Sequence, residues 1–251
     1  MANDLRGVEH QRLLTGIGTA CSFFLRPLYE FVYPPVCTGC GTLLDSGDSK
    51  VCSRCWSSLK VIGRDDPLYL RTYAGLTSEG GIGGLISLYH FERDGILQTL
   101  VHHLKYSGMT SLGVEFGLRL GETLQKSLGE RIISGILPVP LHHARKRERG
   151  YNQNDYVCRG ISRVTGIPVL TNALERRRYT VSQTSLNKVE RRENVSGAFR
   201  VRSSERIVLD GSTVLLVDDV ITTGATVCAC GKALTEVGAA CVIAASIALA
   251  E

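Results

Sequence analysis

Aliphatic runs alternate with amphipathic segments along most of the chain. The runs predicted to be strands lie at 85–91, 133–140, 167–170, 214–217 and 241–248. Between them, the pattern predicts helices over 94–106, 111–127, 151–165 and 225–237. Strands that alternate with helices indicate a parallel sheet with helices on both faces, so the pattern predicts an α/β fold. In such sheets ligands bind beyond the carboxyl ends of the strands.

The first residues carry a different pattern. Residues 8–32 are predicted to form an amphipathic helix whose apolar side carries Leu13, Leu14, Ile17, Phe24, Leu28 and Phe31. Its expected role is packing, with association at a membrane surface as the alternative. The uncharged stretch 13–25 is too short to span a bilayer, and no cleavage pattern of a signal peptide follows it. We therefore expect a cytoplasmic protein.

Composition adds a constraint on the ligand. The 251 residues are 43% hydrophobic and 21% charged, which is ordinary for a soluble globular protein with one main domain and a small accessory one. The formal net charge is +5, and about half of all Lys and Arg lie between Arg145 and Arg202. Such a local basic field fits a polyphosphate ligand or nucleic acid.

Four of the nine cysteines form two paired motifs, Cys37-x-x-Cys40 and Cys52-x-x-Cys55, with 11 residues between them. Two such knuckles supply four thiolates, which suits tetrahedral zinc and leaves no open position for catalysis. The spacing therefore predicts a structural zinc site. The alternatives are four reduced core cysteines or a redox pair. The odd total and the lack of a secretion signal indicate a reducing compartment.

The most informative stretch is VLLVDDVITTGAT at 214–226. An aliphatic strand leads into Asp218 and Asp219, a loop of threonines and Gly224 follows, and a helix begins near Ala225. Backbone N–H groups at a helix N-terminus attract anions, and glycine allows close approach of a ligand. The paired carboxylates can accept hydrogen bonds from the vicinal hydroxyls of a ribose. An ordinary strand–turn–helix is the alternative, but it gives no reason for the twin acids.

This stretch resembles the phosphoribosyl-pyrophosphate (PRPP) binding loop of type I phosphoribosyltransferases. The resemblance implies that Asp218 and Asp219 are the catalytic acids, that they hold the ribose hydroxyls, and that 222–226 hold the 5′-phosphate. The binding residues that it implies are Val217, Asp218, Asp219, Val220, Ile221, Thr222, Thr223, Gly224, Ala225 and Thr226.

Two further stretches extend the resemblance. LPVPLHHARKRERGYNQ at 137–153 and YTVSQTSLNKVERRENVSGAF at 179–199 are similar to segments of the competence protein F family. The resemblance covers most of 34–248. It implies a pyrophosphate loop formed by Val139, Pro140, Leu141 and His142 with Arg145, flanked by Arg149 and Asn152. A solvated helix start is the alternative for the arginines. The resemblance also implies a flexible loop that closes over the ligand, with Gln183, Arg191, Arg192 and Asn194.

The expected organisation is an N-terminal helix at 1–33, a zinc-ribbon module at 34–62 and a domain of the type I phosphoribosyltransferase fold at 63–251. Two functions stay open. The first is transfer of a phosphoribosyl group from PRPP to an unidentified acceptor, with Mg²⁺ on the ligand and release of pyrophosphate. The second is non-catalytic binding of PRPP or a nucleotide in DNA uptake. Its partners would be single-stranded DNA and other competence or recombination proteins. A homodimer is a candidate state, because type I relatives are often dimers.

Overall fold

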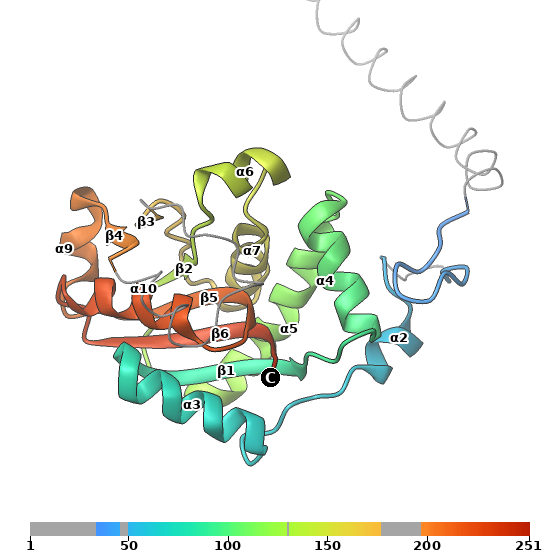
Figure 1. Ribbon diagram of the computed structural model, residues 1–251, viewed down its shortest axis with the longest axis horizontal. Coiled ribbons are helices and arrows are strands. Elements are labelled where there is room, and N and C mark those ends of the chain that lie inside the picture. Colours follow the sequence, from blue (N-terminus) through green and yellow to red (C-terminus); the bar gives the residue numbers. More distant parts are fainter. Residues whose placement is uncertain (1–33, 46–49, 130, 177–196) are drawn as a thin grey trace, which may run out of the picture. The chain divides into compact units, whose positions relative to one another are not determined.

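The computed structural model describes residues 34–45, 50–129, 131–176 and 197–251 (Figure 1). The chain divides into two compact units, Met1–Arg54 and Cys55–Glu251. The division falls inside helix α2, Ser53–Ser58. The helix predicted over 8–32 lies outside the described residues, and the domain limits 1–33, 34–62 and 63–251 stay a prediction.

The described part of the first unit is a short turn-rich segment. Val36 and Leu43 form an antiparallel bridge, and the N–H of Gly41 donates to the Cys37 carbonyl at 2.8 Å. Gly41 has a φ of 72°, a conformation that glycine adopts without steric cost. This tight turn places the side chains of Cys37 and Cys40 close to each other.

A four-stranded parallel sheet forms the centre of the second unit. Its order is β1–β6–β5–β2, and every neighbouring pair is parallel. The strands are β1 (Ile82–His90), β2 (Gly135–Pro138), β5 (Thr213–Ile221) and β6 (Cys241–Leu249). Val214, Leu215, Leu216 and Val217 are fully buried in β5, as expected for a strand covered on both faces.

Helices cover both faces of this sheet, as predicted. Figure 1 shows α3 (Pro67–Gly80) and α10 (Ala225–Thr235) on the near side, and α5 (Thr110–Leu128) and α7 (Gln153–Thr165) on the far side. The shorter helices are α4 (Ile96–Tyr106), α6 (His143–Arg149), the 3₁₀ turn η2 (Ser203–Glu205) and α9 (Arg206–Leu209). The predicted α/β class is therefore confirmed.

Glycines let α5 and α7 pack with their backbones in near contact. A Cβ on Gly117 would collide with the Val157 carbonyl oxygen and lie 2.7 Å from the Gly160 Cα. A Cβ on Gly121 would lie 2.8 Å from the Val164 Cβ. Real Cβ atoms do not approach so closely, so only glycine permits this crossing. The close crossing matters for the site below, because α7 begins there.

Several details differ from the sequence prediction, including helix α3, which the pattern did not indicate. The strand expected over 133–140 is limited to Gly135–Pro138. The strand expected over 167–170 is only a single parallel bridge between Ile136 and Val169. The strand expected to end at 217 continues to Ile221, because Asp218 pairs with Ser246 and Val220 pairs with Ala248. The two acids are therefore strand residues.

An antiparallel pair that the pattern did not indicate lies beside the sheet. It joins β3 (Leu174–Arg176) to β4 (Phe199–Val201). Its strands flank 177–196 in the sequence, and each is too short to show a clear alternation of apolar and polar residues.

Candidate functional site

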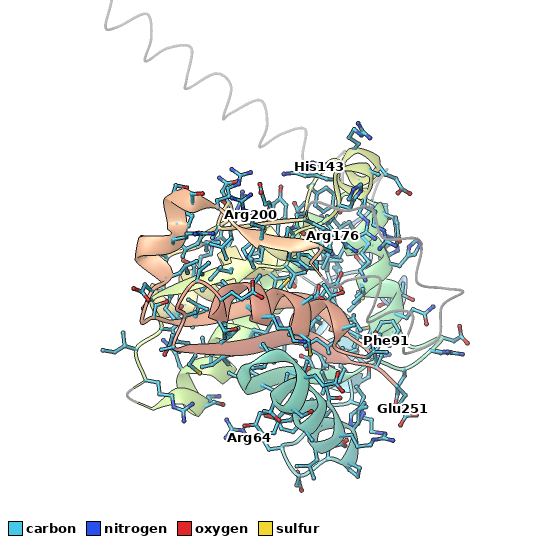
Figure 2. All side chains as sticks on the ribbon, turned by 60° about the vertical axis from the view of Figure 1, so that its left-hand side comes forward. Arg64, Phe91, His143, Arg176, Arg200 and Glu251 are labelled. Atoms are coloured by element: carbon cyan, nitrogen blue, oxygen red, sulfur yellow. The ribbon has the colours of Figure 1, made fainter. Side chains whose placement is uncertain are left out.

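A cavity of about 320 Å³ opens at the carboxyl ends of the sheet strands. Its wall includes the end of β5, the start of α10, the stretch after β2, and residues from α4, α6 and α7. Phe91 and Arg176 also line it. Figure 2 shows Arg176 and His143 in the upper part of the view, away from Phe91. The cavity therefore lies where parallel α/β sheets bind ligands.

The sequence predicts three sets of ligand-binding residues: a sugar-phosphate set at 217–226, a pyrophosphate set at 139–145 and a flexible-loop set at 183–194. The structure brings the first two together in this cavity. Of the sugar-phosphate set, all but Val217 line it, since Val217 is buried in the sheet behind the wall. The whole pyrophosphate set lines it: Val139, Pro140, Leu141, His142 and Arg145. The third set, Gln183, Arg191, Arg192 and Asn194, lies outside the described residues.

Asp219 is buried and held by two donors. Its Oδ2 lies 2.9 Å from the Lys105 Nζ and accepts a hydrogen bond from the Gln153 Nε2 at 2.8 Å. Only 5% of Asp219 is exposed. A buried carboxylate needs such partners, because burial of an unpaired charge is costly.

Asp218 is half-buried beside Asp219 and accepts a hydrogen bond from the Asn154 Nδ2 at 3.1 Å. Burial, and then the neighbouring Asp219 carboxylate, raises the pKa of Asp218 from 3.8 to about 7; Asn154 and Lys105 act in the opposite direction. The pair is therefore asymmetric: Asp219 has a cationic partner within the chain, whereas Asp218 changes charge near neutral pH.

Three consecutive amide side chains at the start of α7 organise this edge of the cavity. Asn152 caps the helix by accepting from the Asn154 N–H, and both Asn152 and Asn154 donate to the Val139 carbonyl oxygen. All three residues, 152–154, are buried. Sequence reasoning gave no role to Gln153 or Asn154. The run of three amides at a helix start was the available signal, because buried amides require partners.

The loop after β5 leads into the N-terminus of α10, where the sequence predicts the 5′-phosphate to bind. α10 begins at Ala225, and the Thr223 Oγ1 accepts from the Ala225 N–H at 3.5 Å. Gly224 has a φ of 74°, and a Cβ there would lie 2.6 Å from the Leu76 Cδ2 of α3. Glycine is thus required by backbone conformation and by packing against α3, a different reason from the predicted approach to a ligand.

In the stretch after β2, two of the four residues have no free backbone N–H to offer a ligand. The Val139 N–H donates to the Val217 carbonyl oxygen at 2.8 Å, and Pro140 has no N–H. The Val139 amide is therefore engaged within the sheet. His142 caps α6 through its Nδ1, which accepts from the Ala144 N–H at 3.2 Å. Burial and then nearby Arg176 lower the pKa of His142, so its neutral, capping form is favoured.

The cysteine cluster fits zinc. The Sγ atoms of Cys37, Cys40, Cys52 and Cys55 all lie within 4.8 Å of one another, and those of Cys40 and Cys52 are 3.8 Å apart. Four sulfurs at about 2.3 Å from a tetrahedral zinc would be about 3.8 Å apart. Burial acts to raise the pKa of the Cys37 thiol, but N–H groups of Cys52, Cys40 and Gly39 outweigh it and lower that pKa. The donor set is therefore suited to thiolate ligation.

Comparisons with known proteins agree with the predicted division into a zinc-binding segment and an α/β domain. The profile of the family described as "Phosphoribosyl transferase domain" matches residues 133–250. The profile described as "Double zinc ribbon domain" matches residues 28–66. The profiles and the cysteine cluster together support a structural zinc. The predicted fold class, a phosphoribosyltransferase fold preceded by a zinc-ribbon module, is confirmed.

The relatives are proteins named for competence and DNA utilization. The chain is 40% identical over 108 residues to competence protein F of Haemophilus influenzae, a match that covers 43% of this chain and 47% of that protein. It is 34% identical over 149 residues to DNA utilization protein YhgH of Escherichia coli K12, covering 58% and 64%. The chain is a homologue of both, and each match spans less than two thirds of the relative.

One solved structure is a glutamine PRPP amidotransferase from B. subtilis. The match has 20% sequence identity and a TM-score of 0.38, and it covers 58% of this chain and 30% of the other. This likeness is too weak to support a statement about fold or activity. Separately, no helix among the described residues combines the length and apolar character needed to cross a membrane.

Proposed function

We propose that the cavity binds PRPP and that the protein transfers its phosphoribosyl group to an acceptor, releasing pyrophosphate. One observation carries this proposal: the twin acids and the N-terminal turn of α10 line the same cavity. The carboxylates of Asp218 and Asp219 accept from the ribose hydroxyls. The amides and hydroxyls of 222–226 hold the 5′-phosphate. Leu141, His142 and Arg145 lie on the side of the leaving pyrophosphate.

The charges of the wall suit this reaction. Displacement at the ribose C1 develops positive charge on the sugar and negative charge on the leaving group. Asp218 and Asp219 supply negative potential near the sugar, and Arg145 and Arg176 supply positive potential elsewhere on the same wall. The protein's contribution is to align the ligand and to neutralise the leaving group.

Mg²⁺ fits this wall as an ion carried with the ligand. Carboxylate oxygens are ligands that Mg²⁺ accepts, but Lys105 already pairs with Asp219. The chain therefore offers the ion little uncompensated negative charge. Phosphate oxygens and hydroxyls of PRPP would supply most of its coordination, and the ion would neutralise charge on the pyrophosphate.

Calorimetry with PRPP and Mg²⁺ tests the binding step. We expect saturable binding to the wild type and none to the Asp218→Ala/Asp219→Ala double variant. Asp65→Asn is the matched control, since Asp65 is exposed and does not line the cavity. Release of pyrophosphate in the presence of pooled metabolites then separates an enzyme from a binding protein. A folded double variant that binds PRPP as tightly as the wild type would contradict the assignment.

Binding of single-stranded DNA is the second candidate. It is favoured by the exposed Arg145, Lys146 and Arg147 on α6 and by the names of the relatives. Contacts to phosphates would make affinity fall steeply with salt. We expect Lys146→Ala/Arg147→Ala to reduce the slope of log affinity against log salt by about 2. An affinity independent of salt would exclude this function.

A further inference from the structure

The central sheet has an open edge at β1, far in sequence from the cavity loops. β1 is an outer strand of the sheet, with β6 as its neighbour on one side (Figure 1). On the other side, the segment before α3 covers one end of β1. The Ile62 N–H donates to the Leu88 carbonyl oxygen at 3.0 Å. The His90 N–H donates to the Lys60 carbonyl oxygen at 2.9 Å. The chain then turns away into α3, so no described strand lies beside residues 82–87.

Two residues of this open stretch direct their backbone polar groups outward. Successive residues of a strand point their N–H and C=O groups to opposite edges. Leu88 and His90 point to the outer edge, and the register with β6 is regular from Gly84 onward. Gly84 and Ile86 therefore point to the same edge. Among the described residues, no backbone group beside β1 bonds to either of them there. Such an edge is a template for a further strand.

A groove of about 620 Å³ follows this edge, and both outward-pointing residues line it. We call it the edge groove. One wall carries Tyr69, Leu70 and Tyr73 of α3, and the other is formed by the end of α5 and the residues after it. The Tyr69 hydroxyl donates to the Leu85 carbonyl oxygen at 2.6 Å, and the two tyrosine rings stack with their centroids 6.3 Å apart. Leu70 is 51% exposed. The tyrosine wall is thus held in place, as in grooves that bind peptides.

The charge of the edge groove indicates what it binds. Arg64, just before α3, and Arg131, just after α5, both line it and are exposed. Figure 2 shows Arg64 beside α3. Among the described residues, neither arginine forms an ion pair, and no acidic side chain lines the groove. A second copy of the chain would bring like charges together at this edge, whereas an acidic segment would be attracted to it.

We propose that the β1 edge is a docking site for an extended acidic segment of a partner protein, which joins the sheet as an added strand. Its backbone bonds to Gly84 and Ile86, alternate side chains pack on the tyrosine wall, and its acidic groups pair with Arg64 and Arg131. No residue of the edge groove lines the cavity at the strand ends. The proposal is therefore independent of the ligand bound there.

Fluorescence anisotropy with two synthetic probes tests the charge requirement. The first probe is a short blocked peptide in which valine and threonine alternate between two terminal glutamates, and the second has lysines at both ends. We expect the first to bind saturably and the second to bind at least about tenfold more weakly. Arg64→Glu/Arg131→Glu should reverse this preference. Arg93→Glu/Arg163→Glu is the matched control, because it changes net charge equally at exposed residues outside the groove; it should keep the preference.

Residue-resolved hydrogen exchange of the wild type tests the backbone contact and needs no variant to fold. With the glutamate peptide at about ten times its Kd, the amides of Gly84 and Ile86 should exchange about tenfold more slowly. Equal slowing at Leu85, which faces β6, would reflect general stabilisation and overturn the proposal. So would absence of binding, equal affinity for both peptides, or reversal in the control variant. A dimer that protects the same amides without peptide would show that a second copy occupies the edge instead.

Discussion

The cysteine cluster and the cavity at the strand ends are assembled in opposite ways. The cluster takes its four ligands from one short stretch, 37–55, with little else needed to bring them together. The cavity takes its polar groups from α4, α6, α7, β5 and α10. A site built from one stretch depends on a single ion, whereas a site built from many elements depends on the packing of the whole domain.

The largest effect should follow loss of the metal ligands. Cys37→Ser/Cys55→Ser should reduce zinc from about one ion per chain to a small fraction. Metal binding supplies about 10–16 kcal/mol of apparent free energy in small zinc modules, so the segment 34–54 should become sensitive to limited proteolysis. Cys241→Ser, outside the cluster, is the control. Full zinc content in the double variant, measured by elemental analysis, would contradict the assigned ligands.

Removing charge from the twin acids should affect ligand binding next most strongly. Asp218→Asn/Asp219→Asn should weaken PRPP binding by more than about 100-fold, because each carboxylate makes hydrogen bonds worth about 1.5–3 kcal/mol. Lys105 would lose its buried partner in this variant, so Lys105→Met should be added to separate charge from packing. If the triple variant regains affinity, the acids act only by neutralising Lys105, and the assignment to the ribose hydroxyls fails.

The close crossing of α5 and α7 can be tested by replacing glycine with alanine at two separate positions, one inside the crossing and one outside it. Gly117→Ala should lower the free energy of unfolding by about 1–3 kcal/mol, because its Cβ would meet the α7 backbone. Gly75→Ala in α3 meets nothing within 4 Å and should raise that free energy by about 0.5–1 kcal/mol. Urea denaturation measures the change in the free energy of unfolding for each variant. Equal effects would mean that the crossing does not depend on glycine.

A pH dependence of stability is expected from Asp218. Its folded-state pKa, about 7, lies above the unfolded value of 3.8. The stability that this group contributes is therefore complete below about pH 4 and is lost as pH rises through about 7. Unfolding free energies measured from pH 4 to 8 should show this decline in the wild type and a flatter profile in Asp218→Asn.

Ligand affinity should change in the opposite sense over the same range. The ionised Asp218 accepts hydrogen bonds from ribose hydroxyls better than the protonated form, so PRPP affinity should rise by up to about tenfold from pH 6 to pH 8. Binding should also release protons, which calorimetry in two buffers of different ionisation enthalpy detects. A rise in pH that leaves affinity and proton release unchanged would remove Asp218 from the binding step.

Most of the fold and the cysteine site could be predicted from the sequence, because both depend on local patterns. Aliphatic runs and helical periodicity are properties of neighbouring residues, and so is the spacing of Cys37, Cys40, Cys52 and Cys55. The sequence did not predict the β3–β4 pair, because strands of three residues show no clear period. It did not predict the close crossing of α5 and α7 either, because a glycine in a helix does not indicate which element packs against it.

The cavity was only partly predictable for a related reason. The stretch from Asp218 to Thr226 is contiguous, so its composition alone indicated a sugar-phosphate site. Gln153 and Asn154 join that site through tertiary packing, and the run of amides at 152–154 indicates burial without indicating which groups they contact. The pairing of Lys105 with Asp219 depends on where α4 ends relative to β5, which no local pattern specifies.

The most direct test of the account is a crystal structure of the complex with PRPP and Mg²⁺. The account predicts the ribose hydroxyls within hydrogen-bond distance of Asp218 and Asp219, and the 5′-phosphate against the N–H groups of 222–226. Density for the ligand elsewhere in the molecule, or a ribose whose hydroxyls face away from both acids, would contradict it.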